Sequence, residues 1–386
     1  MLRFVCIAAL FQFFFGSPQV LGQLRIVSYN TATGEPGGGQ TQPRPGLDTI
    51  LEAIGNENVG GVARPIDVLL LQEQSSSATT TQTIVNQLNA IYGAGTYDLS
   101  TLDGGTWGAG RPGLVYNTQT IELENQVTIG NLSSNGAVRQ TLRYRLQPIG
   151  YGDEAEFYVY NSHYKASTGD DNEARRNVEA NAIRGNSNSL GEGTNVIYAG
   201  DFNIRSSSEG SYQTLLAPGA GQAFDPVDRP GTWNSRATFI DLHTQSPSDG
   251  TVPGLITGGV DDRFDFQLVS GEMLDGEGLD YLPGSYHVFG NNGTHGLDRP
   301  INSSTNTAQP SNILDLLARV TDHLPVVVDY QVPAIMQVEV DFPSRVFVGA
   351  SANTTLSVSN VANATVPIGA DELDFAADIR LSLIHI

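Results

Sequence analysis

The stretch TNVIYAGDFN, residues 194–203, says most about the fold. Thr194–Ala199 is rich in apolar and β-branched residues, which is typical of a strand buried on both faces. Gly200 follows and permits a sharp turn of the backbone. Asp201 and Asn203 lie two residues apart, so in an extended segment both side chains are on the same side. This pair can activate a water and hold a phosphoryl oxygen, although an Asx turn that closes the strand would use the same residues.

Five further segments repeat this arrangement of a strand with a polar residue at its end. They are VSYN (27–30), LLLQE (69–73), NSHYKAS (161–167), RFDFQLVS (263–270) and TDHLPVVVD (321–329). Each motif alone is weak evidence. Their recurrence indicates that several polar side chains collect at one end of a sheet, where sites on such sheets usually form.

Helical patterns lie between some of the strands, which favours an α/β domain over a pure sandwich. In the third predicted helix, Ala174, Val178, Ala182 and Ile183 are expected on one apolar face. Segments rich in Gly, Ser, Thr and Pro are predicted to be loops. The expected strands are 24–29, 67–71, 113–116, 157–161, 194–199, 264–269 and 326–330, the helices 47–54, 83–91 and 171–188, and the loops 34–46, 75–82, 100–112 and 204–260.

The 386-residue chain is strongly acidic, with 20 Lys plus Arg against 41 Asp plus Glu and a net charge of −21. A field of this sign repels a bare polyanion such as DNA, so the total charge does not support electrostatic steering onto nucleic acid. Solubility outside the cell explains the acidity. A local carboxylate cluster that holds divalent cations is compatible with it.

The N-terminus has the features of a signal peptide over residues 1–22. Arg3 supplies a positive charge, and a short apolar stretch runs from Phe4 to Phe15. A membrane anchor is the alternative, but this stretch is too short to span a bilayer comfortably. Cys6, the single cysteine, lies inside it, so the mature chain would have no disulfide, no Cys-bound zinc and no Cys nucleophile. We expect a secreted monomer, extracellular or periplasmic, and bacterial export fits this pattern best.

The character of the chain changes near Pro333. The catalytic domain is expected to span residues 23–333, and residues 334–380 alternate with a period of two, which is typical of the opening strands of a β-sandwich accessory module. Two or three strands cannot close a sandwich alone. The last six residues, 381–386, match a translated sequencing adapter and are left out of the fold prediction; an ordinary strand end is the alternative.

Two motifs carry the most specific chemistry. Asp322 can bind a hard cation through oxygen, and His323 can serve in acid/base or charge-stabilising work with Asp265 as its orienting partner. Glu73 ends an apolar strand, where an ionised carboxylate is costly without a cation or a charged partner. The alternatives are a structural histidine and a structural salt bridge, but only Arg64 among basic residues lies near Glu73 in the sequence.

The order N…QE…H…GDFN…D…DH resembles that of the endonuclease/exonuclease/phosphatase superfamily, which includes DNase I-like nucleases, sphingomyelinases and inositol polyphosphate phosphatases. The resemblance covers roughly residues 24–331, and GDFN together with the DH motif is its most specific part. It implies a DNase I-like, four-layer α/β/β/α sandwich with the site at one end. It also implies a divalent cation, Mg²⁺ or Mn²⁺, with Ca²⁺ as an alternative.

The resemblance also implies roles for single residues. Glu73 resembles the main ligand of the cation, with Asn30 and Asp322 nearby. Asp201 resembles the residue that orients or deprotonates the attacking water, and Asn203 its phosphate-holding neighbour. Two histidines are the remaining catalytic candidates. His323, paired with Asp265, resembles the histidine that stabilises the transition state. His163 resembles a second histidine, which contacts phosphate or protonates the leaving group.

The sequence departs from the DNase-like pattern beside His163. Where such enzymes offer an acidic partner for this histidine, the chain has Gly110-Arg111-Pro112, so we expect His163 to be less basic. Arg111 and Lys165 are candidates for binding the substrate's phosphate. His243, His287 and His295 lack a motif context and are expected in loops.

The intact motif set favours an enzyme over a catalytically inactive binding or adhesion module. A phosphodiester of nucleic acid is the first substrate hypothesis, and phospholipid and phosphomonoester substrates are the alternatives. A lipid substrate would call for exposed aromatic loops, for which Trp107 and Trp233 are the only tryptophans.

Overall fold

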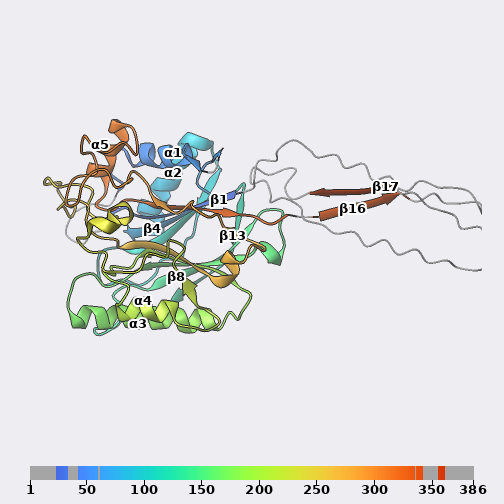
Figure 1. Ribbon diagram of the computed structural model, residues 1–386, viewed down its shortest axis with the longest axis horizontal. Coiled ribbons are helices and arrows are strands. Elements are labelled where there is room, and N and C mark those ends of the chain that lie inside the picture. Colours follow the sequence, from blue (N-terminus) through green and yellow to red (C-terminus); the bar gives the residue numbers. More distant parts are fainter. Residues whose placement is uncertain (1–22, 34–41, 60, 335, 342–354, 361–386) are drawn as a thin grey trace, which may run out of the picture.

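The computed structural model describes residues 23–33, 42–59, 61–334, 336–341 and 355–360. Within these residues, a seven-stranded and a six-stranded β-sheet pack face to face (Figure 1). The predicted signal peptide and the predicted adapter segment lie outside the described residues. Among the described residues, no helix is both long and apolar enough to cross a membrane.

The seven-stranded sheet has the strand order β13-β15-β1-β4-β6-β5, with β14 paired to the other part of β15. Its central strands β15, β1 and β4 are buried along their whole length because both faces of the sheet are covered. The strands are β1 (Gln23–Asn30), β4 (Val68–Gln74), β5 (Tyr97–Leu99), β6 (Arg111–Asn117), β13 (Asp280–Tyr281), β14 (His287–Val288) and β15 (Val326–Gln331).

The six-stranded sheet has the order β11-β12-β10-β9-β8-β7. Its outer strand β7 is buried only at its first and last residues, whereas β10 and β12 are buried almost throughout. The strands are β7 (Ile121–Ile129), β8 (Thr141–Pro148), β9 (Phe157–His163), β10 (Asn195–Asp201), β11 (Ala223–Phe224) and β12 (Asp265–Ser270).

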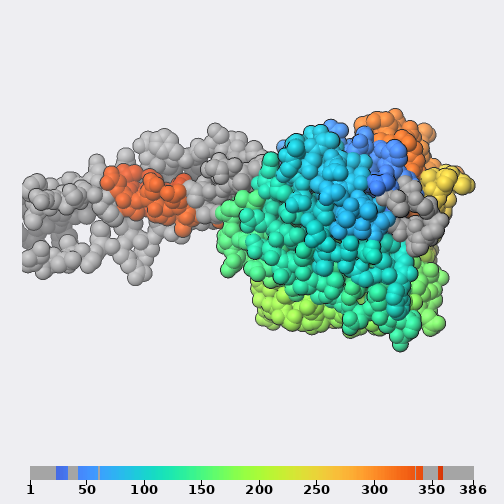
Figure 2. Space-filling model, turned by 180° about the vertical axis from the view of Figure 1, so that it is seen from behind, coloured from blue at the N-terminus to red at the C-terminus, as the bar shows by residue number. Residues whose placement is uncertain are grey.

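Helices cover the outer face of each sheet. In Figure 1, α1 (Leu47–Gly55), α2 (Gln82–Tyr92) and α5 (Ser311–Val320) lie beyond the seven-stranded sheet, and α3 (Asp170–Asn188) and α4 (Gly210–Leu216) lie beyond the other. The space-filling view from behind shows the first half of the domain, coloured from blue to green, over most of the face that is turned to the viewer (Figure 2). The four-layer α/β/β/α arrangement expected from the sequence is therefore confirmed.

Buried amides link the two sheets. Gln72 of β4 donates to the side-chain oxygen of Asn161 on β9 at 2.8 Å. Gln267 of β12 donates to the backbone oxygens of Ile26 and Val326 in the opposite sheet, at 3.0 and 2.9 Å. Because unpaired polar groups are costly in a core, these bonds favour one relative placement of the sheets.

All seven predicted strands and all three predicted helices are present, with shifted ends. The prediction of one loop over 204–260 is wrong, because α4, β11 and a 3₁₀ segment, Ala237–Leu242, lie inside it. Strands β7 and β8 and helix α5 were not predicted. β7 carries four acidic or amide residues within its nine and is mostly exposed or half-buried, so it lacks the apolar signal of a core strand.

The predicted apolar face of α3 is only partly correct. Ile183 is buried and Ala182 packs against the core, but Val178 is 48 % exposed, and Arg176 and Glu179 are buried instead. Arg176 is stabilised there by a bidentate contact with Glu209 and by the backbone oxygens of Lys165 and Ser167. A buried charge with all its partners can replace an apolar residue at a core position, which a hydrophobicity pattern does not reveal.

Beyond the sandwich, β16 (Met336–Asp341) and β17 (Thr355–Asn360) form an antiparallel pair. Met336, Val338 and Val340 alternate along β16 and are 53 %, 48 % and 44 % exposed. In Figure 1 this pair projects away from the four layers. The predicted accessory module over 334–380 stays a prediction, since most of it lies outside the described residues.

Candidate active site

The candidate site lies where several strands end at the same end of the sandwich. β1 and β4 are parallel neighbours, and so are β9 and β10, so the carboxyl ends of each pair meet. β12 runs antiparallel to β10, which places Asp265 opposite Asp201 in register. β15 runs antiparallel to β1, so the residues just before it, including His323, reach the same end. Topology thus collects side chains separated by up to about three hundred positions.

Glu73 projects from an irregular part of β4. The pairing of β4 with β6 shifts register between Leu71 and Gln74, and Glu73 has φ of 58°. A non-glycine residue in this region is strained and is typical of functional sites. Gly110, with φ of 68°, packs against this irregularity, since a Cβ at Gly110 would lie 2.5 Å from the carbonyl carbon of Glu73.

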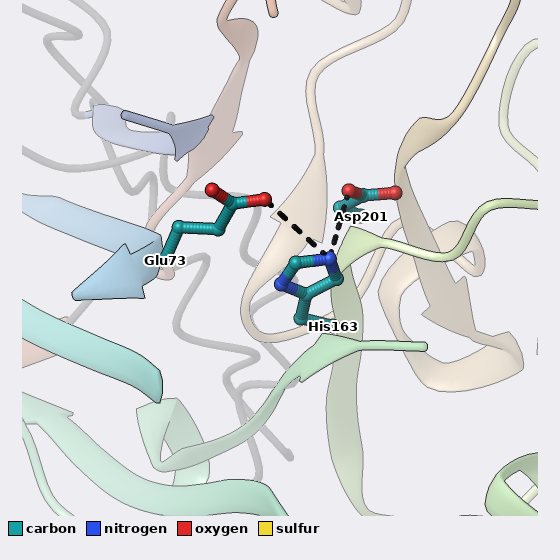
Figure 3. A group of neighbouring side chains, drawn as sticks. All are labelled: Glu73, His163 and Asp201. Atoms are coloured by element: carbon teal, nitrogen blue, oxygen red, sulfur yellow. Dashed lines mark ion pairs between the residues drawn. The ribbon is translucent and has the colours of Figure 1, made fainter. Parts of the chain in front are cut away.

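Glu73, His163 and Asp201 point toward one another from three strands (Figure 3). Nε2 of His163 lies 3.8 Å from Oε1 of Glu73 and 3.3 Å from Oδ2 of Asp201. Asn30 donates its amide hydrogens to these same two carboxylate oxygens, at 3.2 and 3.1 Å. Its own oxygen accepts from the backbone N–H of Ala32, so Asn30 holds the two carboxylates in place.

Asp201 stands at the centre of the site, 2 % exposed. Burial raises its pKa from 3.8 to about 7, and the positive charge of His323 opposes this shift. Its Oδ1 accepts the backbone N–H of Asn203 at 3.1 Å, and Asn203 has φ of 52°. The Asx turn considered as an alternative is therefore present, and it fixes the carboxylate with Oδ2 facing the cluster. Gly200 is required by close packing, since a Cβ there would lie 2.0 Å from the backbone oxygen of Ser162.

His323 pairs with Asp265. Nδ1 of His323 lies 2.7 Å from Oδ2 of Asp265, and its Nε2 is 3.7 Å from Oδ2 of Asp201. Burial acts against the charged form, but the carboxylates of Asp265 and Asp201 outweigh it and raise the pKa of His323 well above its ordinary value. The side-chain amide of Gln245 lies 2.7 Å from Nε2. An imidazolium donates from both nitrogens, so in the charged state the amide oxygen of Gln245 has to face His323.

Asp322 lies apart from the cluster of donor atoms. Its Oδ2 accepts the backbone N–H of Ile256 at 2.9 Å. Its Oδ1 is buried and has no hydrogen-bond partner within the described part of the chain. Asp322 therefore anchors the loop around Ile256 and keeps one oxygen for a further contact.

His163 is enclosed and favours the neutral form. Burial lowers its pKa well below the ordinary value, and the charges of Arg139 and His323 act in the same direction. Nδ1 of His163 is buried, and none of the described residues offers it a hydrogen bond. These observations agree with the missing acidic partner in the sequence.

Arg139 is a site residue that the sequence analysis missed. It is 7 % exposed and donates to the backbone oxygens of Gly108 and Tyr164, at 3.0 and 3.1 Å. Its charge lowers the pKa of both His163 and Asp201. No motif surrounds Arg139 in the sequence, so its position beneath the site could not be inferred. Gln245 was missed for the same reason.

Arg111 and Lys165 do not join the cluster. Arg111 donates to the backbone oxygens of Gly104 and Ser75 and thus ties the loop before β6 to the end of β4. Lys165 is half-buried, and its ammonium donates to the backbone oxygen of Ala166 at 2.6 Å. Burial lowers the pKa of Lys165, and the neighbouring arginines add to this effect.

The other histidines have structural positions. His243 faces the backbone oxygen of Trp233 at 2.8 Å, and His287, which lies in β14 and not in a loop, pairs with Glu57 at 2.7 Å. His295 is buried in a loop, and burial lowers its pKa to about 4. Trp233 is fully buried, whereas Trp107 is 58 % exposed.

Within the described residues, two groups of side chains could hold a metal ion. The first is Glu73, His163 and Asp201, and the second is Asp201, Asp265 and His323; in each, the donor atoms lie within 4.8 Å of one another. The first group fits a divalent cation, because two carboxylates and a neutral imidazole leave a net negative charge to be balanced. In the second, the charged His323 already offsets one of the two carboxylates, so this group fits an ion pair better than a metal site.

Comparison with known proteins gives likenesses in structure only. No protein-family model matches the sequence, and no curated protein does either. Among solved structures, the chain is similar to the catalytic domain of human Nocturnin, at 17 % identity and a TM-score of 0.48 over 81 % of this chain and 96 % of that one. It is also similar to an endonuclease/exonuclease/phosphatase from Bacteroides vulgatus, at 15 % identity and a TM-score of 0.49 over 80 % of this chain and 99 % of that one. A third similar structure is that of D. rerio TDP2 in a complex with a single-stranded DNA product. Its sequence identity is 15 % and its TM-score 0.49, over 80 % of this chain and 99 % of that one. At these identities and TM-scores, function has to be inferred from the chain's own residues.

Proposed function

We propose that this chain is a divalent-metal-dependent phosphoesterase of the endonuclease/exonuclease/phosphatase superfamily. The observation that carries the proposal is the convergence of a charged histidine, a carboxylate with raised pKa and a second carboxylate around one point. Oδ2 of Asp201 lies 3.7 Å from His323 and 3.3 Å from His163, which itself lies 3.8 Å from Glu73. A single phosphorus atom can therefore be reached by all of these groups, directly or through one water.

The roles follow from charge and hydrogen bonding. Asp201, with a pKa of about 7, is suited to accept a proton from an attacking water near neutral pH. His323, kept charged by Asp265, stabilises the negative charge that develops on phosphoryl oxygens. We assign to Asn203, two residues beyond Asp201, the role of holding a phosphoryl oxygen.

The cation would be held chiefly by Glu73. Mg²⁺, Mn²⁺ or Ca²⁺ bound there would neutralise charge on the phosphate and orient it. Asn30 keeps the carboxylates of Glu73 and Asp201 together. Asp322, whose Oδ1 has no hydrogen-bond partner within the described residues, is the further oxygen donor expected from the sequence.

The proposed substrate is a phosphodiester, with nucleic acid as the first candidate. The total charge of −21 opposes a polyanion, but Arg139, whose charge acts on His163 and Asp201, and Lys165, two residues after His163, provide local positive charge. A lipid substrate is less well supported, because Trp233 lies in the core and only Trp107 of the two tryptophans is exposed. The acidic charge of the protein disfavours non-specific binding to nucleic acid, and this is consistent with action outside the cell. The extracellular location is part of the proposal.

The test is a panel of DNA, RNA, sphingomyelin and phosphomonoesters assayed with Mg²⁺, Mn²⁺ or EDTA. We expect hydrolysis of a phosphodiester that EDTA abolishes. Glu73→Gln should weaken the dependence on cation concentration and the rate together, whereas His323→Ala should lower only turnover, by about 10²-fold. A folded, cation-loaded protein that hydrolyses no member of the panel would overturn the proposal in favour of a binding module.

Export and domain organisation are tested separately. N-terminal sequencing of exported protein should give a start near Gln23. A variant that ends at Pro333 should keep its activity, because the sheets and their helices are complete by that point. A folded 23–333 protein without hydrolysis would contradict the accessory role of residues 334–380.

A further inference from the structure

The ring nitrogen of His163 faces two carboxylates from two other strands. Its Nε2 is 3.3 Å from Oδ2 of Asp201 and 3.8 Å from Oε1 of Glu73 (Figure 3). Two atoms that bind one small cation at about 2.1 Å lie roughly 3.0 to 3.5 Å apart, depending on the geometry. The pair of His163 and Asp201 thus has the spacing of neighbouring ligands, the pair of His163 and Glu73 is slightly wider, and all three donor atoms lie within 4.8 Å of one another.

Nδ1 of His163 is buried, and no described residue offers it a hydrogen bond. The carboxylates of Asp201 and Glu73 are the charged groups that its Nε2 faces. A neutral imidazole has a lone pair to offer, and neutral imidazole is the form that binds metals.

We propose that His163 is a direct nitrogen ligand of the cation that Glu73 holds, beside the carboxylate of Asp201, so that the site prefers first-row transition cations to Mg²⁺. This deepens the proposed function and rests on it for the presence of a cation. Mg²⁺ takes oxygen ligands in near-ideal octahedra, whereas imidazole is a ligand for transition metals. Glu73 and Asp201 supply the two negative charges that balance the ion.

Asn30 keeps this donor set in place. It bridges the two carboxylates through its amide hydrogens, and the backbone N–H of Ala32 fixes the amide from the other side. Such an outer partner orients the ligands and tunes affinity. The carboxylates are therefore held close together before any cation arrives, and Nε2 of His163 faces both of them.

The experiment uses Mn²⁺ as a paramagnetic probe of the full chain. Pulsed EPR should detect strong coupling between Mn²⁺ and a directly bound nitrogen, and this coupling should change when the histidines are labelled with ¹⁵N. His163→Asn should abolish the coupling and weaken Mn²⁺ binding by about tenfold or more, while Mg²⁺ binding changes much less. His323→Asn is the matched control and should keep the coupling.

Each outcome decides the inference. Mn²⁺ that binds in a Glu73-dependent way without nitrogen coupling would overturn it, and the labelled wild-type protein gives this result even if His163→Asn fails to fold. Coupling that is lost in His323→Asn but kept in His163→Asn would overturn it too. Metal-dependent hydrolysis without nitrogen coupling would leave the proposed function intact, whereas nitrogen coupling without hydrolysis would remove that function and keep the ligand assignment.

Discussion

The two ends of β1 bury charge in opposite ways. Arg25, near its start, is fully buried and makes a bidentate contact of 2.9 Å with Asp329. Its remaining N–H groups donate to backbone oxygens, including those of Ile54 and Glu57. Asn30 lies at the other end, about 17 Å away along the strand. It stands between the carboxylates of Glu73 and Asp201, whose mutual repulsion lowers the stability of the folded state.

The difference separates structural charge from functional charge. At the Arg25 end each nitrogen of the guanidinium has an acceptor, and the charge of Asp329 cancels that of Arg25, so the pair fixes the geometry. At the Asn30 end the carboxylate of Asp201 has a raised pKa, and one oxygen of Asp265 is buried without a hydrogen bond from the described residues. Such incomplete pairing costs stability and leaves groups free to bind a cation and a substrate.

The largest expected effect comes from breaking the paired end. Arg25→Met leaves Asp329 as a buried charge without its partner, and we expect a loss of about 3–5 kcal/mol in the free energy of unfolding, measured with urea. Combining it with Asp329→Leu should recover much of this loss, because the uncompensated charge is removed. A loss below about 1 kcal/mol for the single variant would contradict the structural role of the pair.

Asp201→Asn should have opposite effects on rate and stability. We expect turnover to fall by about 10²-fold or more, since water activation is lost. Burial raises the pKa of Asp201 from 3.8 to about 7, so the folded state keeps a proton that the unfolded state has released. Stability without cation therefore falls as pH rises from about 4 to 7 in the wild type, and less so in the variant. Thermal unfolding in EDTA at pH 5 and pH 8 measures this, and an equal slope in both proteins would refute it.

Gly110→Ala tests the strained support of Glu73. A Cβ there would lie 2.5 Å from the backbone of Glu73 at a positive φ, so we expect a loss of about 1–3 kcal/mol and a rate lowered by about tenfold. Gly185→Ala is the control, because this glycine lies in α3 with open space around its Cα. The control should gain up to about 1 kcal/mol with unchanged activity. Matching results for both variants would show that Gly110 has no special role.

The smallest effect concerns Glu179, which is buried on α3 beside the site. Burial raises its pKa from 4.5 to about 7, against the opposing effect of the backbone N–H of Lys165. The wild type should therefore lose stability as pH rises from about 4.5 to 7, and Glu179→Gln should lose about 1 kcal/mol less over this window. Urea unfolding at pH 5 and pH 8 checks the sign, and a steeper slope in the variant would contradict it.

The sequence predicted the main strands well because apolar runs that end in polar residues are a local signal. It failed where local and tertiary requirements differ. The face of α3 was misjudged because Arg176 is buried through contacts with Glu209, thirty-three positions away. Helix α4 was hidden in a segment rich in glycine and serine, whose helical state depends on packing against α3.

By itself, the sequence determined the types of chemical group at the strand ends and the order in which the strands deliver them, because both are properties of single segments. Only the tertiary structure decided which groups meet. The register of β10 with β9 and β12 sets Asp201 beside His163 and Asp265, and the packing of the two sheets brings Glu73 to them. The charge states of His163 and His323 differ because their neighbours differ, and neighbours from distant segments are known only once the chain has folded.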